Sequence, residues 1–291
     1  MKTQHIIMFT RNQEVYQKLC ALQFPVDEHF IIVKLYEDDA RWPAVKELAL
    51  EFKHVDSCRS SFSPTECRQA DWIVVGPCWL WGYPKPDDDN GYMELTYDLT
   101  QYCTTCGIGI IQKAPFRVKS EPGWGTRNIL QLNWVFDEYF VRPEIWEAVF
   151  KPFGIERYPV LHHRTGKELT TVVQLKILGE LPAPLQITGY PYESLPASAR
   201  ISEILLSMLQ VTGSPYQDCP VCHRRKFLPI SCGRFPAMTL APTGHAAVKS
   251  QEFFGSGSSA NQKVFFSNAL YRSCIEHQVK GVEYKPVGDG I

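Results

Sequence analysis

Two pairs of cysteines at CxxC spacing constrain this chain more than any other feature. The pairs are Cys103 with Cys106 and Cys219 with Cys222. Chance placement of ten cysteines in 291 residues gives roughly 0.3 such pairs, so two pairs exceed expectation. A CxxC turn directs two sulfurs at one ion, and Zn²⁺ binds four thiolates tetrahedrally. The pattern therefore predicts one structural Zn²⁺ held by all four cysteines, which we call the four-cysteine cluster.

The residues beside the two pairs bear on this prediction. Gly107 follows the first pair and lets the backbone turn so that its amides point back at the sulfurs, as in a zinc knuckle. His223 stands at the same place after the second pair and departs from the glycine pattern. Residues 107–218 separate the pairs, far more than the roughly 15–20 residues of a compact zinc ribbon. The fold must therefore bring the two knuckles together.

Two other interpretations of the pairs stay open. Half-buried thiols without a metal are ordinary in proteins. Redox pairs of the thioredoxin kind lie at a helix N-terminus, whereas Cys106 leads into Gly-Ile-Gly-Ile-Ile, which is typical of a strand. Among the other cysteines, Cys20 and Cys274 fall on predicted helices, where we expect them in the core. Cys232 is an alternative ligand without a partner at knuckle spacing. The remaining three are Cys58, Cys67 and Cys78.

Each CxxC pair is followed by a similar downstream segment. The segments are Phe140–Val160 and Phe265–Val287, and each predicts a strand, a helix and a second strand. Pro143 suits the first turn of the first helix, and Ser267 suits the cap of the second. Both segments end in the pattern Gly-(Ile/Val)-Glu-x-x-Pro-Val. We interpret them as two copies of one module, although strand–helix–strand units in general look alike.

Helical spacing predicts the core residues of each module and the place where its helix stops. In the first module we expect a core of Trp134, Phe136, Phe140, Ile145, Val149 and Phe150. In the second we expect Phe265, Leu270, Cys274 and Ile275. Gly154 and Gly281 stand where a left-handed residue would end each helix.

The first hundred residues predict alternating strands and helices. Strands are expected at Gln4–Phe9, Phe30–Tyr36 and Trp72–Val75. Helices are expected at Glu14–Leu22, from Pro43, and from Ser63, where Glu66 completes a capping box. Further along we expect a strand at Thr170–Ile177 and a helix at Ala199–Leu209.

The predicted fold class is α/β (α+β). An N-terminal α/β region, residues 1–100, precedes a first CxxC module with its linker, residues 101–215. A second CxxC module follows at residues 216–291. In this architecture each module carries a zinc-knuckle hairpin, and the two modules share one metal ion.

Composition narrows the classes of partner and the compartment. Hydrophobic residues make up 44% of the chain, which is typical of globular proteins. The net charge of −1 gives no general reason to expect nucleic acid or an anionic membrane. Neither a signal peptide nor a membrane-spanning stretch is recognisable, so we expect a cytoplasmic protein with reduced thiols. The oligomeric state is not predicted.

Evidence for catalysis in the sequence is sparse. There is no GxGxxG, GxxxxGK(S/T), GxSxG or HExxH motif. His162 and His163 could serve a metal or catalytic site, but a loop pair is the more ordinary interpretation. The acidic run Asp87–Asp89 is more typical of a solvated turn than of a cation site. We therefore expect no catalytic residues and no cofactor beyond the metal.

Taken together, the two knuckles and their downstream modules resemble the bacterial double-CXXCG motif family. The resemblance covers about residues 97–290 and rests on both pairs and both Gly-(Ile/Val)-Glu-x-x-Pro-Val endings. It implies a metal role for the four-cysteine cluster and nothing catalytic. Some members of that family are described as immunity proteins of toxin systems, so the resemblance implies a protein toxin as a partner.

Three functions follow as hypotheses. The first is a non-enzymatic zinc protein that binds a partner such as a toxin. The second is a zinc-ribbon nucleic-acid binder, because the basic run from His223 to Lys226 lies beside the second knuckle. The third is an enzyme whose active site leaves no motif in the sequence, and a deep pocket with convergent polar groups would favour it.

Overall fold

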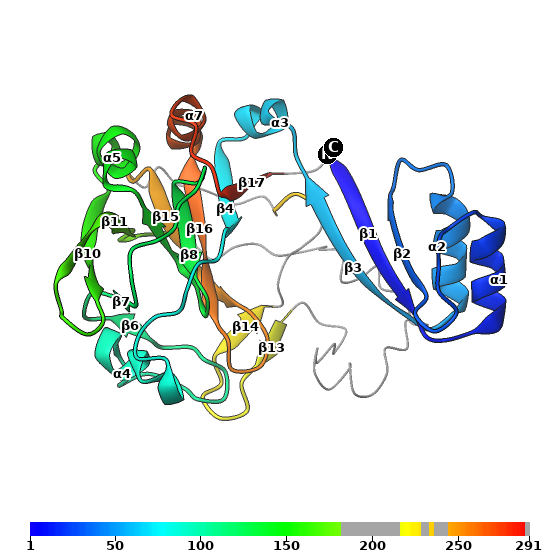
Figure 1. The fold of residues 1–291 in the computed structure, drawn as a ribbon, viewed down its shortest axis with the longest axis horizontal. Coiled ribbons are helices and arrows are strands. Elements are labelled where there is room, and N and C mark those ends of the chain that lie inside the picture. The colour runs from blue at the N-terminus through cyan, green and yellow to red at the C-terminus, as the bar shows by residue number, and fades with distance from the viewer. Residues whose placement is uncertain (182–215, 228–232, 236–243, 289–291) are drawn as a thin grey trace.

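The structure is a computed structural model, and it describes residues 1–181, 216–227, 233–235 and 244–288. Three larger sheets and one two-stranded sheet account for its strands (Figure 1). No helix within these ranges is long and apolar enough to cross a membrane. The predicted helix at Ala199–Leu209 lies outside the described residues.

The N-terminal sheet is three-stranded and antiparallel, in the order β2-β1-β3. Its strands are β1 (Lys2–Phe9), β2 (Ile32–Tyr36) and β3 (His54–Ser61). Two helices, α1 (Gln13–Ala21) and α2 (Trp42–Glu51), cover one face (Figure 1). Alternate residues of β1, including Ile7 and Phe9, pack with Leu19 and Val45 of these helices, because strand side chains alternate between two faces.

A larger sheet combines strands from both ends of the chain. Its main path is β13-β14-β15-β16-β4-β17, and β12 pairs with β15. The strands are β4 (Trp72–Cys78), β12 (Gly179–Glu180), β13 (Tyr216–Asp218), β14 (Arg225–Phe227), β15 (Ala247–Phe254), β16 (Asn261–Ser267) and β17 (Val282–Pro286). Early strand β4 therefore lies between two late strands, β16 and β17, antiparallel to both. The helices α3 (Pro64–Gln69) and α7 (Asn268–Glu276) adjoin this sheet (Figure 1).

The third sheet has the order β7-β10-β11-β9-β8. Its strands are β7 (Arg117–Val118), β8 (Ile129–Leu132), β9 (Val135–Val141), β10 (Glu156–His162) and β11 (Glu168–Lys176). Between β9 and β10 the chain forms α5 (Pro143–Ile145), then a π-helical turn η2 (Trp146–Phe150) and a 3-10 turn η3 (Lys151–Phe153). The remaining elements are η1 (Asp88–Asn90), α4 (Tyr92–Thr96), and the pair β5 (Tyr97–Asp98) and β6 (Ile111–Gln112).

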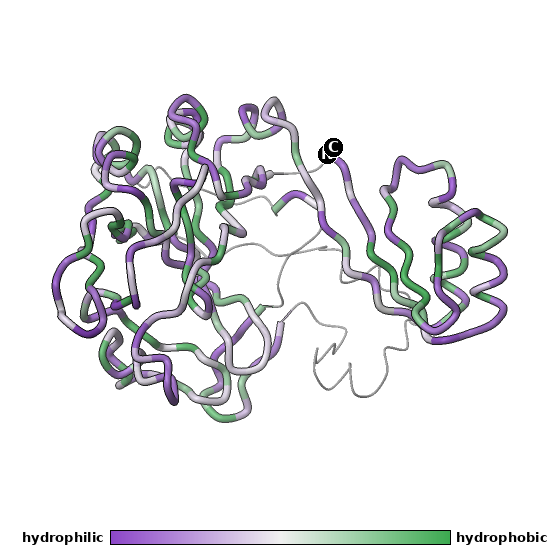
Figure 2. Tube along the Cα trace, viewed as in Figure 1, coloured by the Kyte–Doolittle hydropathy of each residue, from purple (hydrophilic) through white to green (hydrophobic). Residues whose placement is uncertain are grey.

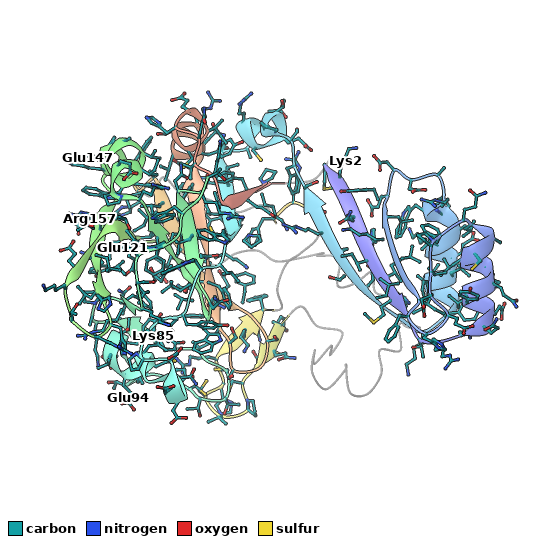
Figure 3. The ribbon with its side chains drawn as sticks, viewed as in Figure 1. Lys2, Lys85, Glu94, Glu121, Glu147 and Arg157 are labelled. Atoms are coloured by element: carbon teal, nitrogen blue, oxygen red, sulfur yellow. The ribbon has the colours of Figure 1, made fainter. Side chains whose placement is uncertain are left out.

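The five-stranded and seven-stranded sheets, which we call the two larger sheets, share a hydrophobic core. Phe150 and Phe266 meet edge to face with ring centroids 5.8 Å apart, and Val149, Leu270 and Cys274 pack in the same cluster. In the hydropathy view, apolar residues run along the strands and helices of this part of the chain (Figure 2). Charged side chains such as Glu147 and Arg157 lie on the outside (Figure 3). Burial of this apolar surface stabilises the sheet pair.

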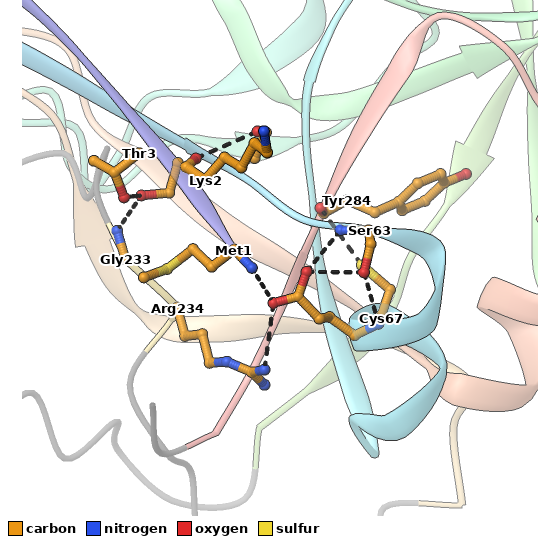
Figure 4. Close-up of polar contacts among 11 residues, drawn as sticks. Met1, Lys2, Thr3, Ser63, Cys67, Gly233, Arg234 and Tyr284 are labelled. Atoms are coloured by element: carbon orange, nitrogen blue, oxygen red, sulfur yellow. Dashed lines mark hydrogen bonds and ion pairs between the residues drawn. The ribbon is translucent and has the colours of Figure 1, made fainter. Parts of the chain in front are cut away.

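Most expected elements of the N-terminal region are present. The capping box forms as predicted: Ser63 Oγ accepts from the amide of Glu66, and the Glu66 carboxylate accepts from the amide of Ser63 (Figure 4). Strand β3 was not predicted, because its sequence HVDSCRSS lacks the β-branched run that marks β2.

The expected division into 1–100, 101–215 and 216–291 stays a prediction, and strand β4 of the first part pairs with strands of the third.

The mixed α/β class is confirmed, whereas the duplication stays a prediction. Both downstream segments do form a strand, a helix and a strand. β9 and β10 flank β11 antiparallel, and β16 and β17 flank β4 in the same way. The predicted starts at Pro143 and Ser267 are confirmed, because Pro143 lies in the first turn and Ser267 Oγ accepts from the amide of Leu270.

Several predicted residue roles are wrong. Trp134 is 45% exposed because it lies in the turn between β8 and β9, where its φ is 69°. Phe136 is 41% exposed because it is the second residue of β9 and lies on the outer side of that strand. Gly154 ends its helix in the left-handed conformation as expected. Gly281 does not, since α7 already ends at Glu276. The other expected core residues are buried, except that Ile145 and Ile275 are only partly buried.

Candidate metal centre

The four predicted cysteines meet in space, and their sulfur atoms all lie within 4.8 Å of one another. The sulfurs of Cys103 and Cys219 are 3.8 Å apart, and those of Cys106 and Cys222 are 3.6 Å apart. A tetrahedral zinc with bonds of about 2.3 Å places neighbouring sulfurs about 3.8 Å apart. The cluster is therefore a group that could hold a metal ion such as Zn²⁺.

The two knuckles have the same backbone geometry. In the first, the amide of Gly107 donates to the carbonyl of Cys103 (2.8 Å). In the second, the amide of His223 donates to the carbonyl of Cys219 (2.9 Å). Both residues are left-handed, with φ of 81° for Gly107 and 59° for His223. His223 thus keeps the turn that the sequence pattern associates with glycine.

Backbone amides point at the sulfurs, as expected for a knuckle. The amide of Ile108 donates to Cys106 Sγ, and the amide of Arg224 donates to Cys222 Sγ, at the same offset in each turn. Amides of Cys106 and Thr105 likewise donate to Cys103 Sγ and lower its pKa. Such amides stabilise thiolates, which are the form of cysteine that binds metal.

Arg224 lowers the pKa of one thiol of the cluster, whereas burial raises the pKa of another. The Arg224 guanidinium lies with Nε 3.3 Å from Cys222 Sγ and lowers the pKa of that thiol to about 6. The same side chain donates from Nη2 to the Gln101 carbonyl (2.8 Å), which ties the second knuckle to the chain before the first. Burial raises the pKa of Cys106 to about 12. A cation at the centre would supply the charge that lets Cys106 ionise.

Lys226 and a hairpin loop enclose the first knuckle. Lys226 is buried, and its Nζ donates to the carbonyls of Cys106 (2.9 Å) and Ser259 (3.1 Å). Ser259 belongs to the loop 255–260, which joins β15 to β16. A Cβ on Gly107 would come within 2.2 Å of the Ser258 carbonyl oxygen, so the loop packs directly on the knuckle.

The basic run beside the second knuckle is engaged within the protein. Arg224 contacts Cys222 and Gln101, and Lys226 is bound by carbonyls. Arg225 forms an ion pair with Asp218 (2.8 Å) and stacks on the Tyr216 ring. Bound in this way, the charges have structural partners, which weighs against their use in a nucleic-acid interface.

The other candidate residues of the sequence do not join the cluster. His162 accepts at Nδ1 from the backbone amide of Thr165 in a turn, and His163 Nδ1 is buried without a hydrogen-bond partner. Asp87, in the acidic run, forms an ion pair with Lys85. No other group of three or more metal-binding side chains occurs among the described residues.

The remaining cysteines differ from expectation in two cases. Cys20 is exposed rather than buried, because α1 presents it to the outer face of its helix. Cys58 is disulfide-bonded, which differs from the expectation of reduced thiols. Cys67, Cys78 and Cys274 are buried free thiols. Cys232, the alternative ligand, lies outside the described residues.

The sequence pattern located the four-cysteine cluster but not the residues that support it. In the sequence, Arg224 and Lys226 stand out only as members of a basic run. The one pattern that could have indicated burial of Lys226 is the alternation of strand β14, in which Lys226 is the middle, buried residue. Comparisons with known proteins add no relative, since no family model, no curated protein and no solved structure matches this chain.

Proposed function

We propose that the four-cysteine cluster binds one structural Zn²⁺ and that the protein acts by binding a partner rather than by catalysis. The observation that carries the proposal is the fit of the sulfur separations, 3.6 and 3.8 Å, to a tetrahedral zinc centre. Four thiolates leave no open position for water or substrate, so the ion would serve the fold. It would join segments that lie more than a hundred residues apart.

Metal content and melting of the purified full-length protein test the zinc centre. We expect close to one zinc per chain after purification without chelator. Cys103→Ser should lose most of the zinc and melt at a lower temperature across the C-terminal two-thirds of the chain, because metal binding energy is part of the folding energy. Cys20→Ser changes an exposed helix cysteine and is the matched control, which should keep its zinc.

Two results would contradict the zinc proposal. One is less than half an equivalent of zinc in the unaltered protein. The other is unchanged melting of Cys103→Ser, which would remove the bridging role even if some metal were present.

For the partner, we propose a protein toxin that this chain neutralises. The resemblance of both knuckles and their downstream modules to double-CXXCG proteins supports this choice, and a closed metal centre is compatible with it. The test is to express the gene next to this one alone and together with it. Toxicity of the neighbour that this protein relieves is expected, and relief should fail with Cys103→Ser but not with Cys20→Ser. A harmless neighbour, or toxicity that persists in the presence of this protein, would reject the toxin as partner.

A further inference from the structure

A filled four-cysteine cluster would carry more negative charge than the ion cancels. The described group holds four cysteines and no histidine, so every ligand would be a thiolate. Four thiolates around one divalent ion leave two negative charges over. Three of the cysteines are buried, and such charge is unfavourable away from water unless opposite charge lies close to it. The side chains around the cluster should therefore supply cations.

Arg224 supplies the first cation. Its Nε lies 3.3 Å from Cys222 Sγ, and its Nη2 donates to the carbonyl of Gln101 (2.8 Å). Gly109 leaves room for this guanidinium, because a Cβ on Gly109 would come within 2.5 Å of Arg224 Nη1. The half-buried side chain is thus held beside the sulfur by contacts to both knuckle regions.

Lys226 supplies the second cation. It is only 4% exposed, and its Nζ donates to the carbonyls of Cys106 (2.9 Å), Gly257 (2.5 Å) and Ser259 (3.1 Å). Carbonyl groups satisfy the hydrogen bonds of an ammonium group but carry no net charge to neutralise it. The charged groups that attract this ammonium are three of the thiolates of the cluster. Its positive charge therefore acts on the cluster.

The residue between these two cations does not share their role. Arg225 forms an ion pair with Asp218 (2.8 Å), so its charge is already balanced. It is exposed, and because strand side chains alternate, it points away from the side on which Lys226 is buried. The basic run thus contains two cations beside the cluster and one that is paired elsewhere.

We propose that Arg224 and Lys226 are the counter-ions of the metal centre and that their two positive charges make it specific for a divalent ion. They cancel the two excess charges of four thiolates around Zn²⁺. A trivalent ion would leave a net positive charge, and a monovalent ion a net negative one. Both are positioning residues, since they act through the thiolates. The inference rests on the proposed metal centre, which the zinc content of the unaltered protein tests separately.

Competition with a chromogenic chelator measures the zinc affinity of full-length variants. Arg224→Gln and Lys226→Gln each remove one positive charge but keep a hydrogen-bond donor, and each should weaken zinc binding about tenfold or more. Arg225→Gln is the matched control, because it removes a charge that Asp218 already balances, and it should hold zinc as tightly as the unaltered protein. Since Arg224 is only half-buried, its variants keep the test decisive even if Lys226→Gln fails to fold.

The reduction potential of the iron-substituted protein separates charge from packing. Iron in place of zinc can be oxidised at an electrode from Fe²⁺ to Fe³⁺, and nearby positive charge disfavours the more positive ferric ion. Arg224→Gln should therefore lower the reduction potential. Arg224→Lys keeps the charge and should stay close to the unaltered protein in both potential and zinc affinity.

Three results would overturn the proposal. The first is that Arg224→Gln retains zinc as tightly as Arg225→Gln. The second is that the iron form of Arg224→Gln keeps the potential of the unaltered protein. The third is a shift in Arg224→Lys as large as that in Arg224→Gln, which would assign the effect to lost packing. Absence of zinc from the unaltered protein would instead refute the metal centre, and this inference with it.

Discussion

At the scale of single residues, Gly107 and His223 share one backbone conformation but face different surroundings. A side chain on Gly107 would overlap the Ser258 carbonyl, whereas His223 already carries its side chain at a φ of 59°. The spacing of the cysteines could predict both turns, because a knuckle is local. It could not predict that only one turn is covered by the loop 255–260, because that contact joins segments far apart in sequence.

This difference predicts unequal effects of two exchanges. Gly107→Ala should destabilise the protein by about 1–3 kcal/mol or more and weaken metal retention, because it combines a left-handed φ with an overlap of atoms. His223→Gly relieves a strained φ in the folded protein but gives the unfolded chain more conformational freedom. These opposing effects should change the free energy of unfolding by no more than about 1 kcal/mol. Urea unfolding and competition with a chromogenic zinc chelator measure both. Equal effects of the two exchanges would contradict the packing described here.

At the scale of elements, His5 links all three strands of the N-terminal sheet. It lies on β1, its Nδ1 is 2.7 Å from the Asp56 carboxylate of β3, and its Nε2 is 3.1 Å from the Glu37 carboxylate just after β2. Its ring stacks on Trp42 at 4.1 Å. The alternating pattern predicted strand β1. It could not predict the contacts of His5, because its partners lie on other strands that are far away in the sequence.

The His5 contact makes the stability of this sheet depend on pH. Burial opposes the charged imidazole, but the hydrogen bonds to Asp56 and Glu37 outweigh it and raise the pKa of His5 above 6.5. The stabilisation is therefore complete below pH 6.5 and is lost as the pH rises through the raised pKa. Urea unfolding followed by tryptophan fluorescence should show this loss, and His5→Gln should abolish it. His277→Gln, an exchange at an exposed histidine, should preserve it.

At the scale of the whole molecule, one buried ion pair joins the two larger sheets. Glu138 of β9 and Lys249 of β15 approach to 2.5 Å, with side chains only 12% and 14% exposed. Gln174 of β11 donates to the same carboxylate (2.9 Å). Sequence periodicity could indicate each strand separately. It could not predict that the two larger sheets pack together, because the residues that join them lie more than a hundred positions apart in the sequence.

Glu138→Gln should cost about 3–5 kcal/mol of unfolding free energy, because it leaves the buried Lys249 ammonium without the carboxylate that pairs directly with it. Adding Lys249→Met to Glu138→Gln should restore much of that loss, since both buried charges are then gone. Glu147→Gln, which breaks the exposed pair with Lys151, is the control and should cost less than about 1 kcal/mol. A double variant as unstable as the single one would show that packing rather than charge dominates here.

The position of β4 has a consequence for synthesis of the chain on the ribosome. Its apolar residues Ile73, Val74 and Val75 emerge early, but both strands that pair with it, β16 and β17, are made near the end. Until then both edges of β4 are open to pairing with other chains. Premature termination upstream of β16 should therefore yield fragments that precipitate, whereas the complete chain closes both edges itself.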